Sequence, residues 1–194
     1  MSCIRPRFTH HLAASCAAAL LVACGGGGAD TQTSDATIGR NNPTDRSGSS
    51  ADAGCGIPDF EAQMLAEVNL VRAQGQQCGN TWQPPVPALN WNTALANTAA
   101  AHSTDMAVHN FVSHTGSSGS SVADRAAAQG YIPGGVGENL GGGHKSISHL
   151  MQGLLASPAH CANLMRPTYT DFGAACVRND ATVYKRHWTQ VFGE

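Results

Sequence analysis

The sequence is poor in charged residues. Only 12% of its 194 residues are Asp, Glu, Lys or Arg, and the formal net charge is −2 at pH 7. Proteins that bind nucleic acid carry a basic surface that neutralises phosphates, and this chain has no basic excess. Nucleic acid is therefore not an expected partner. The chain also lacks internal repeats, and its length corresponds to one domain with flanking segments.

Long hydrophobic runs are missing as well. The apolar run over residues 12–23 follows two arginines and is short for a transmembrane helix, a pattern typical of a secretory signal peptide, predicted at 1–23. The run ends in Leu-Val-Ala-Cys, which resembles the lipobox of bacterial lipoproteins. An ordinary cleavage site beside a cysteine is the alternative. We expect Cys24 to be diacylated, because a glycine run and then a polar segment follow it. Two acyl chains would anchor the protein durably to a membrane, whereas one chain holds only weakly.

The segment after Cys24 has almost no large apolar side chains. Residues 25–54 contain a single one, Ile38. Such a segment cannot bury enough surface to offset the entropy of ordering, so a flexible tether is predicted at 24–54. The residue after Cys24, which would be the second of the mature protein, is Gly25 and not an aspartate. By analogy with such signals, this suggests the outer membrane of a Gram-negative cell, with a periplasmic or extracellular location as the alternative. The folded domain, expected to be a monomer, is predicted at 55–194.

Four cysteines remain in the predicted domain: Cys55, Cys78, Cys161 and Cys176. An even number in an exported domain indicates disulfide bonds, which four cysteines can form in three ways. Sequence neighbours favour Cys55 with Cys78 and Cys161 with Cys176, each closing a loop of roughly 15 to 25 residues and contributing about 3 kcal/mol. Zinc binding by the four is a rival interpretation, which the absence of a Cys-x-x-Cys pair disfavours.

Hydrophobic spacing indicates an α+β fold. It predicts helices at residues 58–75, 92–110, 121–130 and 146–156, a strand or strand edge at 137–140, and two final strands joined by a turn at residues 179–180. Helices followed by a terminal antiparallel hairpin favour helices that cover a small sheet.

Two histidines, His114 and His160, lie at breaks between predicted elements, where a scaffold commonly presents functional groups. His102, in contrast, falls on an apolar helix face and is interpreted as a core residue. Glu138 is one of only four glutamates and lies alone in a glycine-rich segment. Two imidazoles and one carboxylate suit zinc and similar divalent ions. Their spacing alone does not show that the three residues converge.

Six motifs occur in a familiar order: "MLAEVNLVRA", "ALNWN", "FVSHTG", "GENL", "SPAHCANLM" and "HWTQVFG". From about residue 58 to its end, the chain resembles a bacterial member of the CAP/SCP superfamily, which includes the cysteine-rich secretory proteins, antigen 5 and plant pathogenesis-related proteins of class one. The resemblance implies an α-β-α sandwich, with a small antiparallel sheet between helical layers. It also implies a cleft, able to hold a divalent metal in some members, to which "SHT", "GEN" and "SPAH" supply His114, Glu138 and His160.

The chain departs from this family at one position in the cleft. A second glutamate of many eukaryotic members would fall close to Ser157, where this chain has no acidic side chain. His160 is interpreted as a cleft residue held by Pro158 at the head of a short helix, with structural filler as the alternative. Cys161 is expected to join that helix to the strand that carries Cys176.

Three functions follow from these observations. The first is a non-catalytic, envelope-anchored binding module whose cleft takes a divalent metal such as zinc or a small hydrophobic molecule, since relatives bind sterols and other lipids. The second is a hydrolase of envelope peptide or glycan, with a metal at His114 and His160 and Glu138 as ligand or general base, or with Ser157 or Ser113 as nucleophile. The absence of Gly-x-Ser-x-Gly, His-Glu-x-x-His and paired catalytic carboxylates disfavours it, and no catalytic residue is assigned. The third is a structural envelope protein in which the three residues brace the sheet.

Overall fold

The computed structural model describes residues 53–132 and 134–194 of the chain. The predicted signal peptide, Cys24 and nearly all of the predicted tether lie outside the described residues. Within the described part, no helix has both the length and the apolar character needed to cross a membrane.

The described residues form five helices and six strands, and the long predicted elements are among them. The elements are, in chain order, α1 (Phe60–Gln74), β1 (Gln76–Cys78), β2 (Thr81–Gln83), β3 (Asn90–Trp91), α2 (Thr93–His109), α3 (Val122–Ala128), β4 (Val136–Gly142), α4 (Ile147–Ala156), α5 (Pro158–Leu164), β5 (Asp171–Arg178) and β6 (Arg186–Gly193). The turn predicted at residues 179–180 is longer than expected, because β6 begins only at Arg186.

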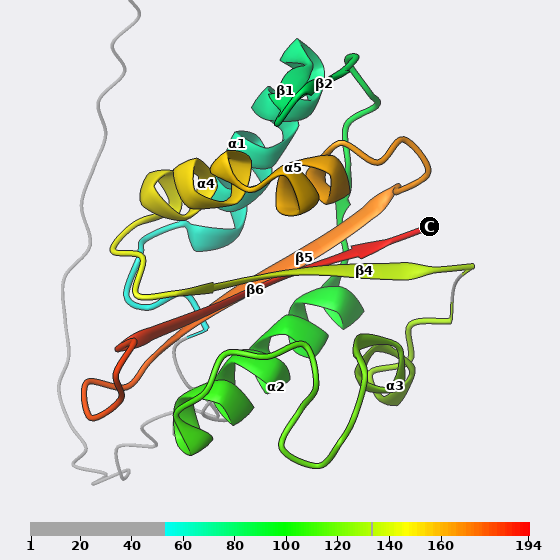
Figure 1. The fold of residues 1–194 in the computed structure, drawn as a ribbon. Helices are drawn as coiled ribbons and strands as arrows, with labels where there is room; N and C mark the ends of the chain where they lie inside the picture. The colour runs from blue at the N-terminus through cyan, green and yellow to red at the C-terminus, as the bar shows by residue number, and fades with distance from the viewer. Residues whose placement is uncertain (1–52, 133) are drawn as a thin grey trace, which may run out of the picture. The chain divides into compact units, whose positions relative to one another are not determined.

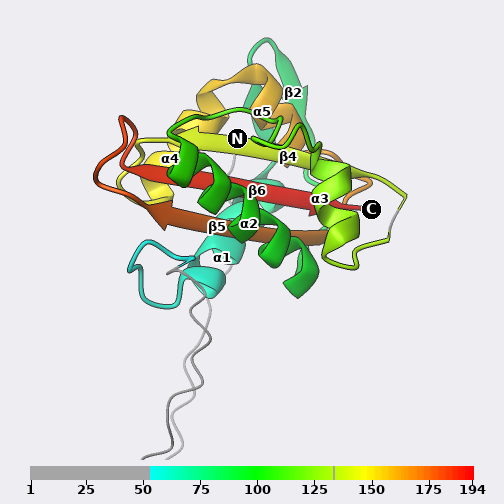
Figure 2. The same cartoon turned by 90° about the horizontal axis from the view of Figure 1, so that it is seen from below.

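A four-stranded sheet lies between two helical layers. Its strand order is β3-β5-β6-β4, with β6 antiparallel to both β5 and β4 and the short β3 parallel to β5. Helices α1, α4 and α5 cover one face of this sheet and α2 and α3 cover the other (Figure 1). Seen from below, α2 and α3 lie across the strands (Figure 2). The predicted α+β fold and α-β-α sandwich are confirmed.

The helices begin where polar side chains satisfy their first backbone N–H groups. Asn92 accepts hydrogen bonds at the start of α2, and Ser146 accepts one at the start of α4. Ser121 and Asp124 form a reciprocal capping box at the start of α3. Pro158 occupies the first turn of α5, where a missing N–H costs nothing. Local sequence therefore sets the starts of α2, α3 and α5, which carry His102, Arg125 and His160.

The apolar core fills both faces of the sheet. One cluster joins α1 and α4 to the sheet and includes Trp188 and Phe192, and a second joins α2 to the sheet through Leu95 and Val191. At Gly173 of β5 a Cβ atom would overlap the backbone of α2, so only glycine permits this close approach. The two central strands are thus buried on both sides.

The predicted disulfide pairing is wrong. The bonds join Cys55 to Cys176 and Cys78 to Cys161, over sequence separations of 121 and 83 residues. The start of the domain lies alongside β5, where the N–H of Cys55 donates to the carbonyl of Cys176 at 3.1 Å. Cys161 therefore does not join α5 to β5, as expected; it joins α5 to the β1–β2 hairpin. Sequence proximity failed because tertiary packing brings distant segments together.

Candidate functional site

The carboxylate of Glu138 is the centre of a buried polar cluster. Glu138 lies on β4 and its side chain is 2% exposed. Its Oε1 lies 2.8 Å from Nδ1 of His114, and its Oε2 accepts a hydrogen bond of 2.7 Å from Nη2 of Arg125 on α3. Arg125 is itself nearly buried and also donates to the carbonyl of Ser120 at 2.7 Å. The negative charge is therefore paired, as burial of a carboxylate requires.

His102 closes the inner side of this cluster. The ring is fully buried on α2, with Nε2 2.8 Å from the carbonyl oxygen of Ser113 and 3.9 Å from Oε2 of Glu138. Burial lowers the pKa of His102, although the charge of Glu138 acts in the opposite direction. The neutral ring donates its Nε2 proton to Ser113, because a carbonyl oxygen can only accept. His102 is thus a core residue that fixes the backbone directly before His114.

His114 presents one ring nitrogen to solvent. It lies in the loop after α2, and its side chain is 62% exposed although its partner Glu138 is buried. Since an ionised carboxylate only accepts hydrogen bonds, Nδ1 of His114 carries the proton in this contact. In the neutral ring, Nε2 then holds a free lone pair. Glu138 fixes both the orientation and the tautomer of this imidazole.

His160 lies on α5, which is bonded to β4 beside Glu138. The carbonyl of His160 accepts a hydrogen bond of 3.3 Å from Asn139, and Asn163 donates to the carbonyl of Glu138 at 3.2 Å. The pKa of His160 is lowered, first by burial and second by the charge of His114. The structure therefore brings His114 and Glu138 into direct contact and places His160 near them. The side chain of His160 makes no hydrogen bond to either one within the described part.

The two candidate serine nucleophiles are not paired with a base. Ser157 is the N-cap residue of α5, and its side chain makes no capping hydrogen bond. The hydroxyl of Ser113 accepts a hydrogen bond of 3.1 Å from the N–H of Thr115. Among residues 53–132 and 134–194, neither hydroxyl is bonded to an imidazole, the arrangement that activates a serine nucleophile.

The donor set for a metal ion is smaller than the sequence suggested. No group of three or more His, Cys, Asp or Glu side chains within the described ranges is arranged to hold a metal ion. Both oxygens of Glu138 are already engaged, one by His114 and one by Arg125. The four cysteines are consumed by the two disulfides. Of the three residues that the sequence suggested, His114 and His160 keep a ring nitrogen that could bind a metal, and Glu138 contacts the other ring nitrogen of His114.

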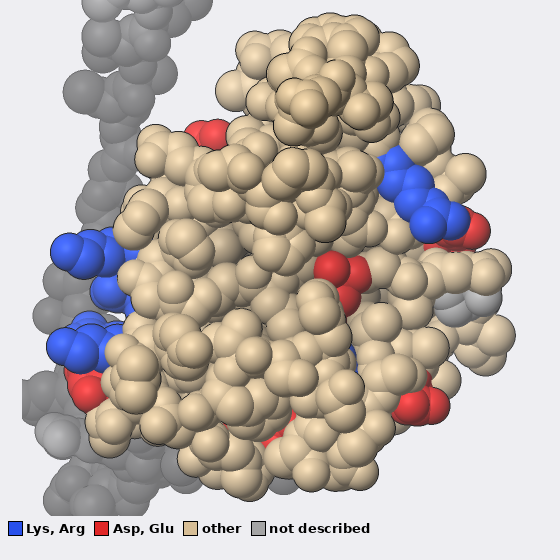
Figure 3. All heavy atoms as spheres, viewed as in Figure 1, with Lys and Arg blue, Asp and Glu red and all other residues tan. Residues whose placement is uncertain are grey.

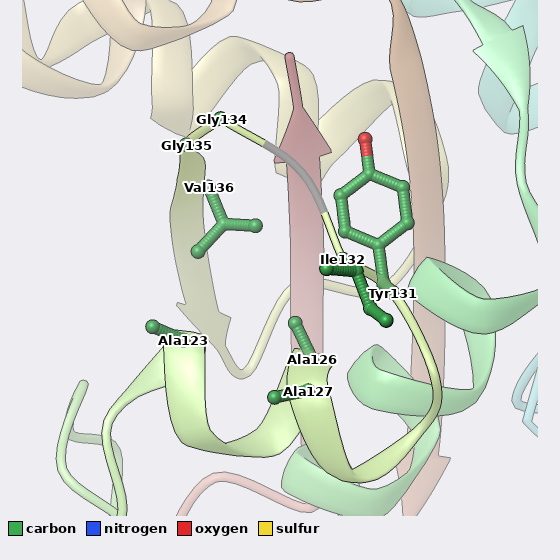
Figure 4. A pocket seen from close by; sticks show the side chains of 8 residues that line it. All are labelled: Ala123, Ala126, Ala127, Tyr131, Ile132, Gly134, Gly135 and Val136. Atoms are coloured by element: carbon green, nitrogen blue, oxygen red, sulfur yellow. The ribbon is translucent and has the colours of Figure 1, made fainter.

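An apolar hollow of about 270 Å³ lies between α3 and β4. Val136 and the ring of Tyr131 line it from opposite sides, and three alanines of α3 form its floor (Figure 4). The hydroxyl of Tyr131 donates to Asp171 at 2.9 Å, and burial together with that bond raises the pKa of Tyr131. Val136 is two residues from Glu138 on the same face of β4, so the hollow borders the polar cluster.

Sequence reasoning missed Arg125, His102 as a site residue, and this hollow. Arg125 occurs in an alanine-rich helical stretch, and the scarcity of basic residues was the one signal that could have drawn attention to it. Its role depends on how α3 packs against β4, which no local pattern encodes.

Comparison with known proteins identifies the domain. The sequence model of the cysteine-rich secretory protein family, CAP, matches residues 65–192. The chain belongs to the CAP family. No curated protein matches this chain. The resemblance noted in the sequence is therefore confirmed at the level of the domain.

Two solved structures show the same fold. The chain is similar to an extracellular protein containing a SCP domain from Bacillus anthracis, with 27% identity and a TM-score of 0.56 over 69% of this chain. The match covers only 39% of the length of the Bacillus anthracis protein. An outer surface protein from Borrelia burgdorferi matches 69% of this chain, and 91% of its own length is covered, with 15% identity and a TM-score of 0.59. The second likeness concerns the CAP fold alone.

Proposed function

We propose that this CAP protein is an exported, non-catalytic binding module in which His114 and His160 together hold a divalent transition metal ion. The single observation that carries the proposal is the 2.8 Å contact between Nδ1 of His114 and buried Glu138, on a ring that is otherwise exposed. Histidines that bind metals commonly donate their second ring N–H to a carboxylate, which orients the ring and raises its basicity. Glu138 would act in this way and not as a direct ligand.

The second imidazole suits the same role. A histidine must be neutral to bind a metal, and the lowered pKa of His160 favours the neutral ring at pH 7. Imidazole nitrogen is a preferred donor for zinc, copper and nickel. Two protein ligands would leave the remaining coordination positions to water or to a bound molecule. Such a site is weaker than a site with four protein ligands and can exchange its metal.

The geometry favours binding over hydrolysis. Glycoside hydrolysis normally needs two carboxyl groups, and Glu138 is the one carboxylate of this cluster, already paired with Arg125. Neither Ser113 nor Ser157 has a histidine as hydrogen-bond partner in the described part of the chain. A purely bracing role for the cluster does not explain why His114 is left exposed on its outer side.

Metal analysis tests this function. The exported protein, purified without chelator, is titrated with zinc beside the variant His114→Ala/His160→Ala. The matched control is His109→Ala/His149→Ala, which removes two other exposed histidines. We expect the control to bind zinc like the unchanged protein and the site variant to lose binding. Equal zinc binding in both variants would contradict the proposal.

The proposed location is the cell envelope, through a lipid on Cys24, with the outer membrane as the compartment. The lipobox-like sequence supports it, as do two disulfides, which persist in oxidising compartments. The similar proteins described above as extracellular and outer surface proteins are consistent with export. Metabolic labelling with a fatty acid should be lost in Cys24→Ala. Label that persists in this variant would rule out lipidation of that residue.

A small hydrophobic molecule is a second candidate ligand, favoured by the apolar hollow beside Val136. Its test uses anilinonaphthalene sulfonate, a dye that fluoresces in apolar sites. Ala127→Trp should block the hollow and reduce the fluorescence, whereas Ala66→Trp, at an exposed position on α1 outside the hollow, should not. Equal fluorescence in the two variants would exclude the hollow as the binding site.

A further inference from the structure

The basic residues of the domain are distributed unevenly. The described ranges contain seven: Arg72, Arg125, Lys145, Arg166, Arg178, Lys185 and Arg186. Three of them lie elsewhere in the fold: Arg72 is fully buried, Arg125 binds Glu138, and Arg166 binds the C-terminal residue Glu194 at 2.9 Å. The other four, which include both lysines of the chain, are called the basic end below: Lys145, Arg178, Lys185 and Arg186.

Strand pairing holds the basic end together. Arg178, at the end of β5, pairs in register with Arg186, the first residue of β6, and Lys185 directly precedes it. The N–H of Gly143 donates to the carbonyl of Arg186 at 3.0 Å, which places Lys145, two residues later, beside the same turn. Figure 3 shows Lys and Arg atoms gathered at its left edge, where the β5–β6 turn and the connection from β4 to α4 lie in Figure 1.

The charge of the basic end is opposite to that of the rest of the domain. Asp180 lies in the same turn and is held by Arg178 at 2.7 Å, so the four cations and this anion carry a side-chain charge of +3. The remaining described residues carry three cations and eight anions, a charge of −5. The hydrogen bond and charge of Arg178 lower the pKa of Asp180, and the charges of Lys185 and Arg186 act in the same direction.

Exposed apolar side chains lie at the same end. Val183 and Tyr184 directly precede Lys185 in the turn and are 79% and 40% exposed. The N–H of Val183 donates to the side chain of Asn110 at 2.9 Å, which joins the turn to the end of α2, where Val108 is 66% exposed. Basic residues around exposed aliphatic and aromatic side chains are typical of surfaces that bind the interfacial region of a bilayer.

The chain enters the described domain near this end. The carbonyl of Ala53 accepts a hydrogen bond of 2.7 Å from Cys176, two residues before Arg178 on β5. Cys55 is bonded covalently to the same cysteine. An anchor at Cys24 would hold the domain close to a membrane, where even weak surface contacts become effective. The first described residues therefore lie beside β5, close to the strand end that carries Arg178.

We propose that the basic end docks on an anionic phospholipid surface, with Val183 and Tyr184 entering the interfacial region and the lysines lying against the lipid phosphates. An acidic protein could satisfy the charges alone, but it would not require exposed Val183 and Tyr184 at the tip of the turn. The docking is separate from the His114 site and does not depend on metal binding. It also does not depend on lipidation, which only raises the local concentration.

Vesicle co-sedimentation tests the docking. The exported full chain with Cys24→Ala, which cannot be acylated there, is mixed with vesicles of phosphatidylcholine containing phosphatidylglycerol, or of phosphatidylcholine alone. We expect binding to the anionic vesicles only, and weaker binding at high salt. Lys145→Gln/Lys185→Gln should lower the partition coefficient roughly 25-fold, since each basic residue near an anionic surface contributes about fivefold.

A variant that removes one positive charge elsewhere separates docking from the effect of net charge, when the losses are compared per charge removed. Arg166→Gln removes an exposed positive charge outside the basic end and should leave binding unchanged within about twofold. Thermal unfolding of each variant shows that the fold is intact. Val183→Ser should weaken binding at unchanged charge. Equal binding to anionic and neutral vesicles, or no binding to either kind, would overturn the proposal. So would a fall in the partition coefficient of Arg166→Gln as large as the fall for each lysine removed in Lys145→Gln/Lys185→Gln.

Discussion

The substitution Glu138→Gln is the sharpest perturbation of the polar cluster. It keeps the size of the side chain and removes its charge. Glu138 and Arg125 are 2% and 9% exposed, so the lost charge leaves a nearly buried guanidinium without its counterion. Loss of one partner of a buried ion pair costs about 3–5 kcal/mol. The glutamine carbonyl can still accept one hydrogen bond, which restores about 1 kcal/mol.

The expected loss in the free energy of unfolding is therefore about 2–4 kcal/mol, or roughly 10 °C in melting temperature for a domain of this size. Urea denaturation followed by circular dichroism measures it, with Glu61→Gln on the exposed side of α1 as the control. The double variant Glu138→Gln/Arg125→Met should be more stable than the sum of the two single losses, by about 1–3 kcal/mol. A loss below about 0.5 kcal/mol in Glu138→Gln, the range of ordinary surface substitutions, would refute the reasoning.

Three further predictions concern stability. Cys78→Ser/Cys161→Ser should lower the free energy of unfolding by about 4–5 kcal/mol, because the bond closes a loop of 83 residues, and urea denaturation that shows a loss below about 1 kcal/mol would contradict this. Gly173→Val should cost at least about 2 kcal/mol, since its Cβ would overlap the backbone of α2; an unchanged melting temperature would exclude that close approach. The protein should keep its full stability above about pH 6.5 and lose stability as the pH falls below that value. The reason is that four histidines have lowered pKa values in the folded state, so the unfolded chain binds more protons there. Equal denaturation midpoints at about pH 7 and pH 5 would contradict the lowered pKa values, chiefly due to burial, of His102, His144, His160 and His187.

The main elements of the fold were predictable because each carries a long local signal. Helices α1, α2 and α4 have apolar spacing over ten residues or more, and β5 and β6 are continuous buried strands. Strands β1, β2 and β3 were missed because they span only two or three residues each. A pattern of that length cannot be distinguished from a loop.

The site was predictable only in part. The conjunction of His114, Glu138 and His160 came from resemblance to the CAP family, since no local spacing links a loop, a strand and a helix. The role of Arg125 depends on the packing of α3 against β4, and the disulfide of Cys55 depends on its position beside β5. Contacts of this kind are fixed by the tertiary structure, so sequence proximity gave the wrong pairing for the cysteines.

The central claim is that His114 and His160 form one site. The most direct measurement is a zinc titration of the exported protein followed by nitrogen-15 NMR of the histidine rings, with His109 as an internal reference because its ring is also exposed. We expect Nε2 of His114 and one ring nitrogen of His160 to shift together, at the same zinc concentration, while His109 stays unchanged. Shifts of the two rings at different zinc concentrations, or a shift of His109 equal to theirs, would contradict the account.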